Sequence, residues 1–106
     1  MDILFRDNDN LLEVLGVRNG ITTQFINSAT ATVTVTDLKG IEISGASWPL
    51  TLSYVTGSDG DYRGVLPDVL ILPTTSRQVA ATIIVDGGVN LKATFKCLID
   101  VRDRKC

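Results

Sequence analysis

The chain has 106 residues, of which 44% are hydrophobic and 21% charged, with no histidine and a net charge of −2. This apolar fraction is typical of one folded domain and excludes an intrinsically disordered chain. The slightly acidic balance does not favour a nucleic-acid-binding protein, and the run of about 20 apolar residues that a membrane-spanning helix needs is absent. We therefore expect a single domain over residues 1–106, with neither nucleic acid nor membrane as a partner.

The N-terminal residues show no clear alternation of apolar and polar side chains. Ile3, Leu4 and Phe5 are consecutive apolar residues, and a polar turn follows them at residues 7–10. We expect residues 1–10 to form an extended arm in which Ile3, Leu4 and Phe5 are candidate contacts with a partner. Residues 11–17 predict a strand, and residues 21–26 predict another strand or an edge piece.

The middle of the chain alternates with period two, which places successive side chains on opposite faces of a strand. Residues 29–36 alternate alanine or valine with threonine, which is typical of a half-buried strand. In residues 48–55, Trp48 and Tyr54 share a face with two leucines. We expect Trp48 and Tyr54 to belong to the core between two sheets, in preference to an exposed aromatic binding platform.

A turn cluster at residues 57–61 precedes an extended segment at residues 62–66, and two prolines then predict a loop over residues 67–76. The clearest hairpin joins residues 78–85 to residues 91–102 through Asp-Gly-Gly. One row of the last strand is expected to face inward: Leu91, Ala93, Phe95, Cys97, Ile99 and Val101.

These elements add up to about seven short strands, and no window has the spacing of an amphipathic helix. Such a series of strands with a turn about every ten residues is typical of an antiparallel sandwich. The predicted fold is therefore an all-β, immunoglobulin-like antiparallel β-sandwich.

Positive charge gathers at the C-terminal end, where residues 92–106 hold five basic and two acidic residues. Such polarity suits docking on an oppositely charged partner or head-to-tail contacts between copies, although a solvated strand face is the simpler interpretation. We expect residues 102–106 to form a second arm. The candidate partner contacts in this region are Lys92, Lys96, Arg102 and Arg104.

Metal and disulfide chemistry have little support in the sequence. Cys97 and Cys106 are the only thiols, and two cysteines without histidine cannot complete a four-ligand zinc site. Whether Cys106 forms an intermolecular disulfide stays open. The acidic turns at residues 7–10 and 59–61 resemble fragments of calcium loops but lack the full ligand pattern, so ordinary turn chemistry is favoured.

Catalytic motifs are also missing. Without histidine, neither a Ser-His-Asp nor a Cys-His arrangement can form within the chain, and no phosphate-binding or dinucleotide-binding glycine motif is present. We expect no enzyme activity and no cofactor.

Two resemblances bear on identity. Residues 57–67 contain Asp-Gly-Asp-Tyr and then Leu-Pro, which resembles a signature of immunoglobulin-like sandwich domains, including carboxypeptidase-regulatory-like modules. The resemblance covers about residues 29–101, and it implies that Tyr62 packs in the core after a tight turn. It speaks to the fold far more than to function.

Residues 45–52 (Gly-Ala-Ser-Trp-Pro-Leu-Thr-Leu) and 61–63 (Asp-Tyr-Arg) resemble segments of small virion structural proteins of tailed bacteriophages. This resemblance implies a head decoration, head–tail connector or tail-associated protein that binds capsid, portal, neck or tail proteins, and copies of itself, in the virion after synthesis in the bacterial cytoplasm. Two alternatives stay open: a carbohydrate- or surface-binding module, and an assembly chaperone absent from the final particle. We expect no secretory leader at the N-terminus.

Overall fold

The computed structural model describes residues 3–18, 24–72, 77–88 and 91–103, and these residues form strands, turns and loops without a helix. The predicted all-β class and the expected number of strands are confirmed. The seven strands are β1 (Ile3–Phe5), β2 (Asn10–Val14), β3 (Thr30–Thr36), β4 (Leu50–Tyr54), β5 (Tyr62–Leu66), β6 (Gln78–Asp86) and β7 (Lys92–Arg102).

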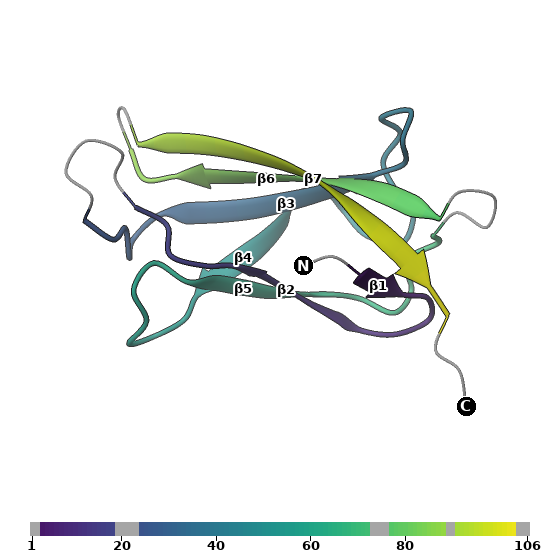
Figure 1. Cartoon of the computed structure of the whole chain (residues 1–106), viewed down its shortest axis with the longest axis horizontal. Coiled ribbons are helices and arrows are strands. Elements are labelled where there is room, and N and C mark those ends of the chain that lie inside the picture. The colour runs from purple at the N-terminus through teal and green to yellow at the C-terminus, as the bar shows by residue number, and fades with distance from the viewer. Residues whose placement is uncertain (1–2, 19–23, 73–76, 89–90, 104–106) are drawn as a thin grey trace.

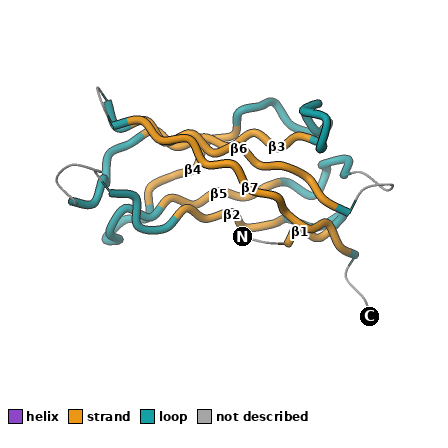
Figure 2. Tube along the Cα trace, turned by 45° about the horizontal axis from the view of Figure 1, so that its top comes forward, coloured by secondary structure: helices purple, strands orange, loops and turns teal. Residues whose placement is uncertain are grey.

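The strands form one continuous sheet in the order β1-β7-β6-β3-β4-β5-β2. All neighbouring pairs are antiparallel except β1 and β7, which run parallel. In Figure 1, β3 and β6 lie above β2 and β5, while β4 slants between them and pairs with both β3 and β5. The two layers expected of a sandwich are therefore two halves of one sheet that folds over its own core (Figure 2).

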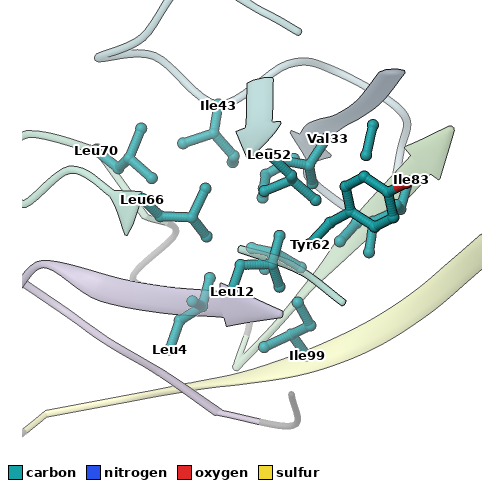
Figure 3. Packing of buried hydrophobic residues seen from close by; sticks show 14 of the residues in the cluster. Leu4, Leu12, Val33, Ile43, Leu52, Tyr62, Leu66, Leu70, Ile83 and Ile99 are labelled. Atoms are coloured by element: carbon teal, nitrogen blue, oxygen red, sulfur yellow. The ribbon is translucent and has the colours of Figure 1, made fainter. Parts of the chain in front are cut away.

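The core lies between these halves, and the alternation of β3 and β6 determines most of it. The inward residues of both strands are at most 4% exposed, whereas their outer rows include the threonines of β3. Burying each large aliphatic side chain contributes about 1.5–3 kcal/mol. Figure 3 shows that side chains from both halves point into one interior, among them Leu12 of β2, Val33 of β3, Leu66 of β5 and Ile99 of β7.

The three aromatic residues expected in the core differ in depth. Tyr62 is fully buried; its hydroxyl donates to the Ile26 carbonyl (2.7 Å) and accepts from the Ala29 amide (3.0 Å). Trp48 and Tyr54 are half-buried at the margin of the core. The Trp48 indole nitrogen donates to the Ile43 carbonyl at 2.7 Å.

The N-terminal residues are part of the sheet, which corrects the expectation that residues 1–10 form an arm. β1 pairs with the end of β7, and Leu4 is 0% exposed because alternation in this short strand turns its side chain into the core. Leu4 therefore has no surface to offer to a partner. Residues 1–2 lie outside the described residues, as do residues 104–106 of the expected C-terminal arm.

The side chain of Asn10 links the two end strands of the sheet. Its Oδ1 accepts from the Phe5 amide and its Nδ2 donates to the Phe5 carbonyl, each at 3.0 Å. Asn10 is 8% exposed and is the buried polar side chain of the described core. These two hydrogen bonds join the Phe5 backbone in β1 to the first residue of β2 at this end of the sheet.

The expected strand at residues 21–26 is described only in part. Residues 19–23 lie outside the described ranges, and Phe25 forms an isolated bridge with Arg18.

Candidate functional site

The outer edge of β7 is covered along only part of its length. β7 has eleven residues, whereas β1 has three and pairs only with Asp100, Val101 and Arg102. Figure 1 shows the C-terminal end of β7 descending to β1, while its N-terminal half lies beside β6 and well away from β2. In the described part of the chain, no strand pairs with the outer edge of residues 92–98.

The hydrogen bonds at the end of β7 show which backbone groups this edge presents. The Val101 amide donates to the Arg77 carbonyl on the β6 side. The Arg102 carbonyl accepts from the Arg6 amide on the β1 side. The register between β6 and β7 continues from this point to Lys92 without a bulge. Since the direction of N–H and C=O alternates along a strand, Thr94, Lys96 and Leu98 direct their backbone groups to the uncovered edge.

Beside this edge, the inward row of β7 loses its cover. Ile99 is 0% and Val101 3% exposed, as expected of a core row, but Phe95 is 43% exposed and Cys97 is half-buried. Phe95 therefore has the predicted orientation without the predicted burial. The short β1 begins opposite Asp100, so no described strand pairs with β7 beside the residues before it.

A groove of about 480 Å³ lies over these residues. One wall comes from β2 and the segment after it, and the other comes from β7, with a contribution from β6. The lining residues are Glu13, Val14, Leu15, Gly16, Val17, Arg18, Ile83, Ala93, Phe95 and Cys97.

The wall after β2 is held in place by the turn before β5. The Val17 amide donates to the Gly60 carbonyl (2.8 Å), and the Gly16 amide donates to Oδ1 of Asp61 (2.9 Å). Gly60 has a φ of +73°, and a Cβ at this position would lie 2.5 Å from the Val17 carbonyl oxygen. Only glycine fits this close approach, so the turn fixes one side of the groove.

Positive charge lies on the outer face of β7, opposite the face that lines the groove. Lys92 and Lys96 are exposed on the outer face of β7, and neither has an ion-pair partner among the described residues. Arg18 lies at the opposite wall, with its guanidinium 4.3 Å from the centroid of the Phe25 ring. The acidic lining residue, Glu13, is 3.8 Å from Arg63.

The candidate contacts predicted from the sequence fall into separate places. Ile3 and Phe5 are half-buried in β1, whereas Lys92 and Lys96 lie at the uncovered edge. Arg102 is exposed and lies 3.5 Å from the Asp100 carboxylate, a pair that β1 already flanks. Arg104 and Cys106 lie outside the described residues.

The residues at 13–18 were not expected to form a binding surface. The sequence holds one signal of an uncovered surface: the apolar N-terminal segment has three residues, which is too few to pair along the whole of the eleven-residue last strand.

The acidic turns have structural roles in the described parts of the chain. Oδ1 of Asp61 accepts from Gly16, and Oδ1 of Asp9 accepts from the Asp68 amide at 2.9 Å. Among the described residues, no three histidine, cysteine or acidic side chains gather as metal ligands would. No helix of sufficient length and apolarity to cross a membrane occurs there either.

Comparison with protein-family models, curated proteins and solved structures found no match to this chain.

Proposed function

We propose that this protein is a non-enzymatic structural protein of a tailed-phage virion, immunoglobulin-like in fold, that binds capsid, neck or tail subunits in multiple copies. The observation that carries the binding role is the uncovered edge of β7 beside an apolar groove. An unpaired strand edge presents donors and acceptors that an added strand satisfies, and the groove offers apolar surface to its side chains.

The phage assignment rests on the sequence resemblance at residues 45–52 and 61–63. The structure adds a reason for a binding role in preference to a purely scaffolding one. Phe95 and Leu98, on opposite faces of one strand, are 43% and 60% exposed at the uncovered edge. Exposed apolar side chains beside unpaired backbone groups of a strand are typical of an edge that another chain covers.

The carbohydrate-binding alternative needs exposed aromatic side chains with free polar atoms. The Trp48 nitrogen donates within the chain to Ile43, and the Tyr54 hydroxyl donates to the Ser58 carbonyl. These internal hydrogen bonds use the polar atoms that would recognise a sugar. The edge of β7 therefore gives stronger support to protein binding than the aromatic residues give to carbohydrate binding.

Mass spectrometry of gradient-purified particles, from a host that carries the gene, tests this function. The expected result is that the protein is present at a fixed ratio to the major capsid protein and in several copies per particle. Its absence from particles, in a lysate where it is expressed, would contradict the structural role and favour an assembly chaperone.

A further inference from the structure

We propose that the groove between β2 and β7 binds an extended segment of another protein, which adds a strand to the edge of β7 and carries acidic residues at alternate positions. This inference deepens the proposed function and rests on it for the partner's being a protein subunit. The segment would lie in line with β1, because β1 already occupies the same edge at residues 100–102.

The edge determines the conformation and length of the segment. Thr94, Lys96 and Leu98 each present an amide and a carbonyl, so an extended chain can form a ladder of hydrogen bonds with them. Paired strands advance equally, by about 3.3 Å per residue, so a segment of about seven residues spans residues 92–98 of β7.

The two faces of β7 determine the composition of the segment. Side chains of the segment that point to the inner face would lie near Phe95 and Cys97 and toward Val14 on the opposite wall. These apolar surroundings favour apolar residues in the segment. Side chains on the outer face of the segment would lie beside Lys92 and Lys96. Lys96 is opposite Thr82 of β6, and Lys92 is opposite Asp86, but neither lysine makes an ion pair among the residues that the structure describes. Opposite charges in neighbouring strands stabilise pairing, which favours acidic residues in alternation with apolar ones.

The same charges argue against a second copy of this chain at the edge. Two copies paired through residues 92–98 of β7 would bring Lys92 and Lys96 of both copies onto one face of the new ribbon. Like charges that face each other across strands are destabilising. A partner with acidic residues fits the edge better than a symmetric dimer does.

The probe for this proposal is a capped synthetic heptapeptide that alternates glutamate with valine, and the control probe replaces glutamate with lysine. Titration followed by backbone NMR should shift the amides of Thr94, Lys96 and Leu98 and the side-chain signals of Phe95. We expect the acidic peptide to bind at least tenfold more tightly than the basic one at low salt. Raising the salt concentration should reduce this preference.

Two sets of variants identify the contacts. Lys92→Glu with Lys96→Glu should reverse the preference between the two peptides, and these exposed changes leave the core intact. Thr94→Pro removes an edge donor and should abolish binding, whereas Thr94→Val keeps the amide and should retain binding.

Equal binding of both peptides, binding of neither, shifts confined to another surface, or a dimer formed through β7 would each overturn the proposal. Such a result leaves the proposed function testable by itself, because the presence of the protein in particles is measured without any peptide.

Discussion

The two halves of β7 have the same sequence pattern and the same partner strand, yet they differ in surroundings. Both halves alternate apolar with polar residues, and both pair with β6 in one continuous register. In the C-terminal half, where β1 pairs with β7, Ile99 and Val101 are buried in the core. In the N-terminal half, Phe95 of the same row is 43% exposed over the groove. Alternation therefore predicts the side to which a residue points, whereas its burial depends on a second strand elsewhere in the sequence.

The largest expected effect comes from Ile99→Ala in the covered half. Ile99 is 0% exposed, so truncation leaves a cavity in the core and should reduce the free energy of unfolding by about 2–5 kcal/mol. Urea denaturation followed by Trp48 fluorescence measures this change. If the free energy of unfolding fell only as little as it does when an exposed side chain is truncated, the end of β7 would not be packed as described.

A second prediction concerns the link that closes the covered end. Asn10→Ala removes both part-buried hydrogen bonds to Phe5 and should reduce the free energy of unfolding by about 1–3 kcal/mol, because each such bond contributes about 0.5–1.5 kcal/mol. Asn8→Ala is a neighbouring control, since its side chain contacts the Arg6 carbonyl on a less buried turn. If both variants had equal stability, the Asn10 side chain would not be what joins β1 to β2.

A third prediction concerns the wall of the groove. Gly60→Ala places a Cβ against Val17 in a backbone conformation that costs a residue with a side chain about 1–2 kcal/mol. We expect lower stability and altered amide shifts at residues 15–18. Gly57→Ala is the matched control, because Gly57 also has a positive φ (+81°) but no atom within 4 Å of its Cβ position. Equal effects would mean that backbone strain alone, and not the contact with Val17, explains the loss.

The smallest effect on stability is expected from Phe95→Ser in the uncovered half. Because Phe95 is 43% exposed, the change should cost well under the 3–5 kcal/mol typical of a buried phenylalanine. It should nevertheless weaken binding of the acidic peptide, which the titration described above measures. A destabilisation as large as that of Ile99→Ala would show that Phe95 is covered in the folded protein.

The sequence predicted the strands in the middle and at the end of the chain because their alternation is long. The strand expected at residues 29–36 is observed as β3 (Thr30–Thr36), and the strand expected at residues 78–85 is observed as β6 (Gln78–Asp86). β1 was missed because three consecutive apolar residues give no period. Asn10 has the composition of a turn residue, and only its position beside Phe5 reveals its role.

The groove was harder to predict than the strands. Its walls come from residues 13–18 and 93–97, which are far apart in the sequence and in the strand order, and which face each other only because the sheet folds over its own core. The parallel pairing of β1 with β7 determines where the cover of β7 ends, and pairing partners cannot be read from a single strand's pattern. The basic residues Lys92 and Lys96 were identified, but not the uncovered backbone beside them.

Hydrogen exchange along β7 tests the central claim most directly. The account predicts an alternating pattern in the isolated protein: the amides of Thr94, Lys96 and Leu98 exchange fast because they face the uncovered edge, whereas those of Phe95 and Cys97 are protected by β6. The Arg102 amide, on the β1 side, should be protected. Strong protection of Thr94, Lys96 and Leu98 in the free protein would contradict the account, because it would show that the edge is already paired.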